Sequence, residues 1–367
     1  MRATAQPPRG ATIRDVAMRA GVSTATVSRA LRRSAGVDPA TRLRVEAAVR
    51  ELRYRPSGVA RSLKLRTTQT LGLIVTDIEN PYFPQVVRAV EDAARSRGFS
   101  VVLADGRRDP ERELQSLEIL AERQVDGLLI ASSAITRRHR SWIKERPCPV
   151  VIINSGSTIA GVPAVLSDNE AGGRMAAEHV MALGHRQLAY IAAPAAGNVA
   201  VRERLRGVHM ALEAGHLGEE GLYVVQGDGG VEAGDVAARQ VLSHRPRTSA
   251  LICYNDLTAV GALRGVRSMG LDVPGDVSVV GFDDIELAPY VTPPLTTIRQ
   301  VTEEMGHWAV DTLIAMITAD PAAVPPDRMA AVDTARTLSR AGPGLIQRIP
   351  VQLVVRGSTA RAPALAR

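Results

Sequence analysis

The sequence predicts an α/β protein in which a small helical head precedes a larger region of parallel sheets covered by helices on both faces. Two observations carry this prediction. Residues 12–52 show three short helical periods separated by turn residues, whereas the chain from Leu71 onward alternates short apolar runs with amphipathic segments. Strands without polar alternation, separated by helices, are typical of parallel sheets that are buried on both faces.

The head begins after a polar arm, residues 1–10, for which no regular structure is expected. Thr12 is a favourable N-cap for a first helix, and Gly21-Val22-Ser23 ends that helix and turns the chain. Ser23 then caps a second helix, which we expect to run from Thr24 to about Leu31. A third helix is expected over 39–52, because Pro39 suits a first helical turn.

The apolar positions of these helices predict a common core. In the first two helices they are Ile13, Val16, Ala17, Val27, Ala30 and Leu31. In the third helix they are Leu43, Val45, Ala48, Val49 and Leu52. Arg55-Pro56 breaks the chain after them, so the head is expected to cover residues 11–56.

The second helix keeps one face outside this core. That face consists of Thr24, Ala25, Ser28, Arg29 and Arg32. Two short helices joined by such a turn are typical of a helix-turn-helix, whose second helix lies in the major groove of DNA. The alternative is a surface helical hairpin with no role in nucleic-acid binding.

The distribution of charge favours the DNA-binding interpretation. The chain holds 45 Lys and Arg against 38 Asp and Glu, a net charge of +7. Residues 1–70 hold 15 basic and four acidic side chains, a net of +11, so the remaining residues carry a net of −4. Positive charge gathered in one small segment indicates a phosphate-backbone binder. An anionic membrane is a weaker match, because these helices are short and not one long amphipathic stripe.

Other classes are disfavoured by composition. Cys148 and Cys253 are too few for a disulfide scaffold or a zinc cluster. The N-terminus MRATAQPPRGA lacks the apolar stretch of a secretory signal, and no apolar run approaches membrane-spanning length. We therefore expect a cytoplasmic protein without a metal, a cofactor or a membrane partner.

The second region is predicted from two alternating sets of segments. The apolar runs expected as strands are 71–76, 100–103, 127–131, 150–153, 188–192, 224–225, 250–253, 277–281 and 297–298. The helices expected between and after them are 82–97, 109–123, 170–183, 202–214, 232–243, 257–269 and 302–317. This alternation predicts doubly wound parallel sheets.

Polar residues follow many of the predicted strands and indicate a ligand cleft. They are Asp77, Ser132, Ser133, Asn154, Ser155, Asn255, Asp256, Asp283 and Asp284. Open parallel sheets bind ligands beyond the carboxyl ends of their strands. Helix capping is the alternative role, which we favour for Asn80 and Asp256 because each stands at a helix start. For Asn154 and Asp283 we favour ligand contact.

Several motifs in a fixed order resemble the lactose/galactose-repressor (LacI/GalR) family. They are the head, RPSGVARSLKLRTTQTLGLIVTDIENPYF, SDNEAGG, LGHRQLAYI, ICYNDLTAVGAL, VPGDVSVVGFDD and PPLTTIRQ, over residues 12–317, with a further match at 350–359. The resemblance implies a hinge helix and linker at 57–70. It also implies a core at 71–360 like a periplasmic sugar-binding protein, with two subdomains, three crossovers and an effector cleft, before a tail at 361–367.

The subdomains implied by the resemblance are each discontinuous in sequence. The first is expected to consist of about 71–168 plus 300–330, and the second of about 169–299 plus 331–360. The family usually has a short connection where this chain has residues 318–349, which contain four prolines. A connection of this length indicates an exposed insertion.

The resemblance also implies which residues contact DNA. Thr24, Ala25 and Arg29 correspond to base-contacting positions, and arginine suits a bidentate pair with guanine. Ser23, Thr26 and Ser28 correspond to phosphate-contacting positions. In the hinge segment GVARSLKL, Leu63 corresponds to a leucine that wedges into the minor groove, with Arg61 and Lys64 near the backbone.

The effector-contacting positions implied by the resemblance are Phe83, Asn154, Arg204, Asn255, Asp283 and Gln300. Arg204 and Asp283 suit charge-assisted hydrogen bonds to vicinal hydroxyls or a polar ring, and Phe83 suits stacking on a sugar or base face. Arg202 and Arg206 are near enough in sequence to compete for the position of Arg204, whose alternative role is a core salt bridge.

Together these features predict a homodimeric, effector-controlled repressor of a carbohydrate-use operon that releases double-stranded operator DNA when a sugar binds. A corepressor-dependent repressor or an activator of the same family stays open as an alternative. A cytosolic sugar-processing enzyme is disfavoured, because the sequence contains no metal cluster, phosphate loop or nucleophile–base motif. A solute-binding protein is disfavoured by the absence of a signal peptide.

Overall fold

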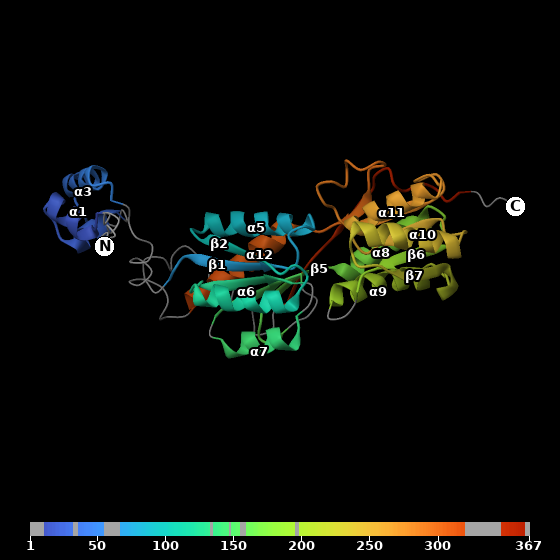
Figure 1. Cartoon of the computed structure of the whole chain (residues 1–367), viewed down its shortest axis with the longest axis horizontal. Coiled ribbons are helices and arrows are strands. Elements are labelled where there is room, and N and C mark those ends of the chain that lie inside the picture. The colour runs from blue at the N-terminus through green and yellow to red at the C-terminus, as the bar shows by residue number, and fades with distance from the viewer. Residues whose placement is uncertain are drawn as a thin grey trace, which may run out of the picture. The chain divides into compact units, whose positions relative to one another are not determined.

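The computed structural model describes residues 11–31, 36–54, 67–132, 135–146, 148–154, 159–194, 198–319 and 346–363. The chain forms two compact units, Met1–Thr68 and Gln69–Arg367 (Figure 1). The predicted hinge residues Arg61, Leu63 and Lys64 lie outside the described residues, as does most of the predicted insertion.

The first unit is the predicted three-helix head. Its helices are α1 (Ile13–Ala20), α2 (Thr24–Leu31) and α3 (Pro39–Glu51). Thr12 caps α1 in a reciprocal capping box with Asp15, and Gly21 ends that helix in the left-handed conformation, φ 67°. Val16, Val27 and Val45 are fully buried between the three helices.

One predicted core position of the head is wrong. The side chain of Leu43 is 65% exposed, whereas Val45 and Ala48 of the same helix are buried. Because α3 packs with a narrow stripe of small residues, Leu43 falls on its outer face.

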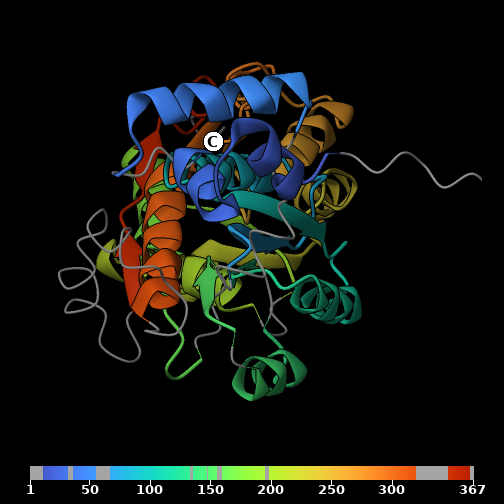
Figure 2. The same ribbon diagram turned by 90° about the vertical axis from the view of Figure 1, so that its left-hand side faces the viewer.

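In the second unit, the first of two sheets is entirely parallel, in the order β11-β5-β4-β3-β1-β2. Its strands are β1 (Thr70–Val75), β2 (Ser100–Asp105), β3 (Gly127–Ala131), β4 (Val150–Ile153), β5 (Ala164–Ser167) and β11 (Ile346–Ile349). Its helices are α5 (Tyr82–Ser96), α6 (Pro110–Glu122), α7 (Arg137–Glu145) and α12 (Thr302–Ala319). Leu71, Leu73 and Val75 pack with α5 and α12, whereas Ile74 packs with α6 and α7 on the other face (Figures 1 and 2).

The second sheet has the order β12-β10-β9-β8-β6-β7 and is parallel apart from β12. Its strands are β6 (Leu188–Ala192), β7 (Leu222–Gln226), β8 (Ala250–Cys253), β9 (Ser278–Asp283), β10 (Thr296–Arg299) and β12 (Gln352–Val354). Its helices are α8 (Asn169–Ala182), α9 (Val199–Ala214), α10 (Val231–His244) and α11 (Asp256–Ser268), with a 3₁₀ turn at Glu219–Gly221. The predicted doubly wound architecture is thus confirmed.

Within the described residues the chain passes between the sheets three times, after β5, β10 and β11. This agrees with the crossovers that the resemblance implies. One expected boundary is wrong, because β11 pairs with β5 in the first sheet and not in the second. The first sheet therefore holds Ile346–Ile349, and the last crossover follows Ile349. The sequence IQRI is mostly exposed at the sheet edge, so it carries no continuous apolar signal.

Two further elements were not predicted. β5 has only four residues, and α7 has the sequence RRHRSWIKE, in which only His139, Trp142 and Ile143 are buried. Among the residues that the structure describes, no helix combines the length and apolar character needed to cross a bilayer.

Glycines allow two helices of the second sheet to approach to backbone contact. A Cβ atom at Gly173 on α8 would lie 2.0 Å from the carbonyl oxygen of Arg204 on α9. A Cβ atom at Gly207 on α9 would lie 2.0 Å from the carbonyl oxygen of Glu170. This close packing fixes the height of α9 beside α8, and with it the position of Arg204.

Gly207→Ala should therefore lower the free energy of unfolding by about 1–3 kcal/mol, because the two helices must separate. In an uncrowded helix the same change would stabilise by up to about 1 kcal/mol. Urea unfolding followed by circular dichroism measures the difference. An unfolding midpoint equal to or above that of the wild type would contradict the packing described here.

Candidate functional site

The first unit presents the predicted base-contacting residues on the exposed side of α2. Thr24, Ala25 and Arg29 are all exposed, and their spacing places them on one side of the helix. Ser23 Oγ accepts a hydrogen bond from the Thr26 backbone N–H at 3.1 Å and lies 2.9 Å from Thr26 Oγ1. Ser23 thus has the local capping role, and its outward position leaves it accessible to a phosphate as well. Ser28 is half-buried on the same helix.

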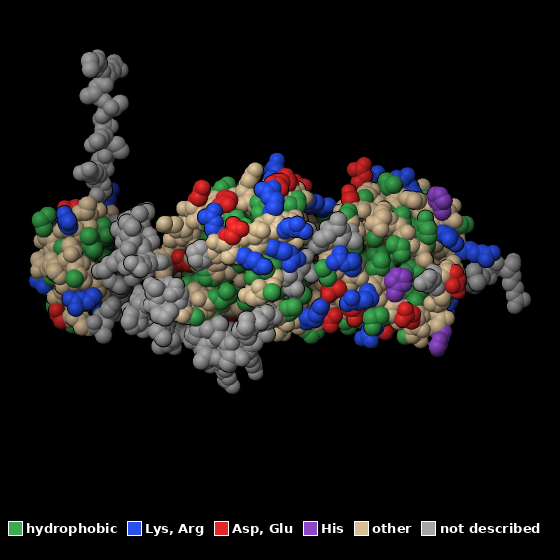
Figure 3. All heavy atoms as spheres, turned by 90° about the horizontal axis from the view of Figure 1, so that it is seen from below, with side chains coloured by type: hydrophobic (Ala, Val, Ile, Leu, Met, Phe, Trp, Pro, Cys, Tyr) green, Lys and Arg blue, Asp and Glu red, His purple; other side chains and the backbone are tan. Residues whose placement is uncertain are grey.

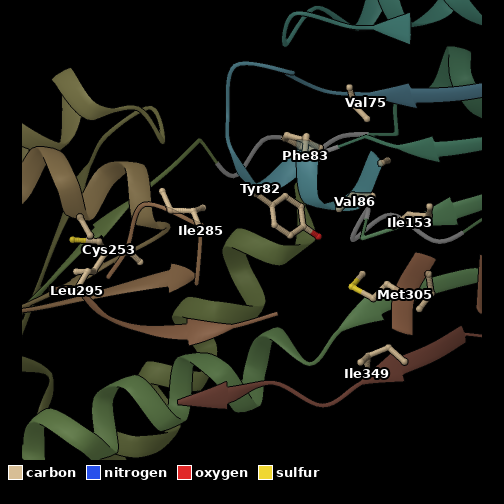
Figure 4. Packing of buried hydrophobic residues seen from close by; sticks show 14 of the residues in the cluster. Val75, Tyr82, Phe83, Val86, Ile153, Cys253, Ile285, Leu295, Met305 and Ile349 are labelled. Atoms are coloured by element: carbon tan, nitrogen blue, oxygen red, sulfur yellow. The ribbon is translucent and has the colours of Figure 1, made fainter. Parts of the chain in front are cut away.

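The second unit contains a cavity of about 280 Å³ at the carboxyl ends of strands from both sheets. All six predicted effector-contacting residues line it, namely Phe83, Asn154, Arg204, Asn255, Asp283 and Gln300. The structure therefore brings together side chains that come from six different strand ends and helices. Tyr82 and Phe83 enter it from the start of α5, where they pack among buried residues (Figure 4).

A chain of hydrogen bonds through Gln300 joins the two sides of this cavity. Asn154 Nδ2 donates to Tyr82 Oη at 2.6 Å and to Gln300 Oε1 at 2.8 Å. Ser167 Oγ also donates to Gln300 Oε1, at 2.5 Å, and Gln300 Nε2 donates to Asp283 Oδ1 at 2.6 Å. Gln300 stands on the crossover between β10 and α12, so its amide links strand ends of both sheets.

Hydrogen bonds and an aromatic ring fix the position of the Arg204 guanidinium. Its Nε donates to Asn169 Oδ1 at 2.9 Å and its Nη1 donates to the Tyr254 carbonyl at 2.7 Å. Its carbon Cζ lies 3.6 Å from the centre of the Phe282 ring, a cation–π contact. Arg204 is buried, whereas Arg206 is exposed and pairs with Glu170. Arg204 therefore, and not its neighbour Arg206, faces the cavity.

Asn255 lines the cavity and also takes the capping role that was expected for Asp256. Asn255 Oδ1 accepts from the Thr258 backbone N–H at 2.8 Å, so Asn255 caps α11 while its Nδ2 donates to the Gly229 carbonyl. Asp256 was expected as the cap, and this is wrong because it lies within the first turn. Its carboxylate accepts from Thr297 Oγ1 at 2.5 Å and from the Ile285 backbone N–H at 2.9 Å, which holds the loop after β9.

Asn80 bonds to the first residue of α5 but is not its N-cap, which is Pro81, so the expected capping position is wrong by one residue. Its Oδ1 accepts from the Tyr82 backbone N–H at 3.1 Å, just before α5. Asn154 and Asp283 instead adopt positive φ angles of 47° and 133°. Such conformations cost about 1–3 kcal/mol for a residue other than glycine and gather at ligand sites, which supports the ligand-contact interpretation of both residues.

Burial changes the acidity of Asp283, which lines the cavity, and of Asp256, which holds the loop after β9. It raises the pKa of Asp283 to about 8, although the charge of Arg204, whose Nη1 lies 3.7 Å from Asp283 Oδ1, acts in the opposite direction. Burial also raises the pKa of Asp256 to about 6, against the hydrogen bonds from Thr297 and Ile285. The pKa of the Tyr82 hydroxyl is likewise raised by burial, so it stays protonated.

Other cavity residues were not predicted from the sequence. They include Tyr82, Arg108, Glu113, Asn198 and Tyr254. Arg108 and Glu113 come from the loop after β2 and from α6, where no strand-end pattern marks them. Tyr82 adjoins Phe83 at the start of α5 and Tyr254 directly follows β8, so the strand-end criterion extended to tyrosine would have found the second of them.

A helix-turn-helix head joined to a two-sheet unit with a strand-end cleft defines a DNA-binding regulator with a ligand-binding core. A model of bacterial regulatory proteins of the lacI family matches residues 12–57, and a model of a periplasmic binding protein-like domain matches residues 177–359. The ribose operon repressor of Escherichia coli K12 is 39% identical over 309 residues, covering 84% of this chain and 93% of that protein. The chain belongs to the lacI family, and the expectation of a transcriptional regulator instead of an enzyme is confirmed.

Solved structures agree with this assignment. The Lac repressor dimer bound to operator and the anti-inducer ONPF has a TM-score of 0.81 and 30% identity, covering 96% of this chain and all of that chain. A LacI family transcriptional regulator from Enterococcus faecium with bound ribose has a TM-score of 0.66 and 26% identity, covering 80% of this chain and 99% of that chain.

Asp283 predicts a pH dependence of stability. Its pKa in the folded protein, about 8, lies above the ordinary value of 3.8, so between these values the folded state holds a proton that the unfolded state has lost. The free energy of unfolding should then fall as pH rises from about 4 to 8, by at most about 1.4 kcal/mol per pH unit. Asp283→Asn should flatten this slope in urea titrations at pH 5, 7 and 9. Parallel slopes for the variant and the wild type would contradict the raised pKa.

Proposed function

We propose that this protein is a homodimeric repressor of a carbohydrate-use operon, which binds a pseudopalindromic operator and releases it when a sugar enters the cleft. The observation that carries the proposal is the polar cavity itself, in which Asn154, Arg204, Asp283 and Gln300 converge at the ends of both sheets. Such convergence of donors and acceptors suits a small hydroxyl-rich ligand. The protein would act in the cytoplasm, where its DNA is.

Operator binding is supported by charge and by the exposed face of α2. The net charge of +11 in residues 1–70 suits the phosphate backbone, whereas basic and acidic side chains are mixed on the face of the second unit drawn in Figure 3. Arg29 would read a guanine, Thr24 and Ala25 would contact neighbouring bases, and Ser23, Thr26 and Ser28 would bind phosphates. Leu63, with Arg61 and Lys64, would enter the minor groove at the operator centre.

A monosaccharide is the ligand class that the cavity favours. Its volume of about 280 Å³ is at the lower end for small-molecule sites, which suits a pentose or hexose better than a disaccharide. Two relatives point the same way, since one is a repressor of a ribose operon and another binds ribose. Arg204 and Asp283 would grip vicinal hydroxyls, and Phe83 would cover an apolar sugar face.

The crossovers would transmit the effect of ligand binding to the DNA-binding heads. Ser167 precedes the first crossover, Asn169 follows it, and Gln300 forms the second, and all three belong to the hydrogen-bond network of the cavity. A ligand that changes these bonds changes the angle between the two sheets. In a dimer, linker residues 57–70 would pass this change to the heads, as a coupling free energy of about 1–3 kcal/mol.

Fluorescence anisotropy with a central-CpG palindrome from upstream of the protein's own gene tests the proposal, with and without a panel of sugars and nucleosides. We expect tight, salt-sensitive binding that one sugar releases. Binding that requires an added compound would instead establish a corepressor system. Absence of specific binding under every condition would overturn the operator-binding proposal.

Arg29→Ala should weaken operator binding by about 1–3 kcal/mol and relax the preference at one base pair in each half-site. Competition anisotropy against operators substituted at single positions measures both effects. Arg19→Ala is the matched control, because Arg19 Nη2 pairs with Glu51 Oε2 at 2.8 Å and lies outside α2. Equal weakening of all operator sequences by Arg29→Ala would show that Arg29 contacts only phosphate.

A further inference from the structure

A buried carboxylate that the sequence did not predict forms part of the cavity wall. Glu113 lies on α6, its exposed fraction is 3%, and it lines the cavity from the side of the first sheet. Asp283 and Arg204 line the same cavity from the second sheet and α9. Glu113 is therefore separate from the group of effector-contacting residues that the resemblance implies.

The hydrogen bonds of Glu113 are incomplete. Its Oε2 accepts from Ser132 Oγ at 2.7 Å and lies 3.3 Å from His139 Nε2, which makes no hydrogen bond within the described residues. Its Oε1 accepts no hydrogen bond from the residues that the structure describes. A carboxylate offers about four acceptor positions, and a buried one is costly unless they are used. Glu113 thus keeps acceptor capacity at the cavity.

His139 lies beside Glu113 and is held by the residue that caps its own helix. The backbone N–H of Thr136 donates to His139 Nδ1 at 3.3 Å, and Thr136 Oγ1 lies 2.7 Å from the same nitrogen. His139 Nε2 makes no hydrogen bond with the described residues, so His139 does not use the acceptor positions of Glu113.

The other charged side chains of the cavity wall lie close to groups of opposite type. Arg108 Nε donates to Asp77 Oδ2 at 2.6 Å, and Arg204 Nη1 lies 3.7 Å from Asp283 Oδ1. Asp228 also lines the cavity but is exposed to solvent. Glu113 makes no ion pair with a lysine or arginine of the described residues, so the part of the wall that it forms disfavours an anion and favours hydrogen-bond donors.

The fold makes room for this side chain at one neighbouring position. A Cβ atom at Gly106, in the loop after β2, would lie 2.5 Å from Glu113 Cγ and 3.0 Å from Glu113 Oε1. Only glycine at this position leaves the carboxylate where it is. The position of the Glu113 side chain therefore depends on the absence of a Cβ atom at Gly106.

We propose that Glu113 is a specificity-determining residue of the cleft: its carboxylate accepts a hydrogen bond from a hydroxyl of the effector and excludes the phosphorylated form of the same sugar. This inference rests on the proposed function, because it concerns the effector of the same cavity. It predicts that the protein responds to the free sugar and not to the sugar phosphate made from it by a kinase-type reaction.

Isothermal titration calorimetry with the full-length protein tests this. The probes are D-ribose and D-ribose 5-phosphate, followed by D-xylose, L-arabinose, D-glucose, D-galactose and D-fructose with their phosphate esters. We expect the free sugar to bind at least tenfold more tightly than its phosphate. Glu113→Gln, which keeps the shape and removes the charge, should weaken the free sugar about tenfold or more and reduce this discrimination.

Two further variants complete the test. Glu111→Gln is the matched control, because Glu111 lies on the same helix, is exposed and pairs with Arg138 outside the cavity. It should bind both probes as the wild type does. Gly106→Ala should weaken the free sugar by displacing Glu113, and it provides an independent variant if Glu113→Gln fails to fold.

The outcomes separate the two proposals. Sugar binding that is unchanged in both Glu113→Gln and Gly106→Ala, or tighter binding of the phosphate, would overturn the role of Glu113 and leave the proposed function intact. Absence of binding by any sugar would overturn the proposed effector class itself, and the proposed role of Glu113 with it.

Discussion

One buried amide, that of Gln300, joins strand ends of both sheets: it accepts from Asn154 and Ser167 and donates to Asp283. Because Gln300 stands on a crossover, these bonds hold the two sheets at a defined separation around the cavity. Arg204 continues the network through Asn169 to the start of α8. The positions of these cavity-lining groups thus depend on hydrogen bonds made at the crossovers.

The cavity contains buried charged and polar groups that contribute little to the stability of the fold. Asp283 and Arg204 are both buried, and burial of polar and charged groups seldom stabilises a fold more than apolar packing would. Asp283 also stands at a φ of 133°, a conformation that is unfavourable for aspartate. Buried polar groups of this kind are suited to ligand recognition, and Glu113 is another of them on the other side of the cavity.

Elements whose side chains repeat with a regular period were predicted most accurately. Fully buried strands such as β1 and β9, and amphipathic helices such as α5, were placed within a few residues. Elements with a short or polar pattern were missed: β5 has four residues, α7 has few apolar positions, and β11 lies at a sheet edge. The cap of α11 shows the same limit, since a shift of one residue decides that Asn255 and not Asp256 meets the helix N–H groups.

The sequence by itself determined the two-part organisation, the helix-turn-helix and the six residues expected in the cleft, because strand-end positions and family motifs are local properties of the chain. Only the tertiary structure decided which sheet holds β11, which arginine of α9 faces the cavity and that Glu113 enters its wall. These depend on packing between segments far apart in sequence, such as the helix contact at Gly173 and the space left by Gly106. Close packing selects one arrangement among many that a periodic pattern allows.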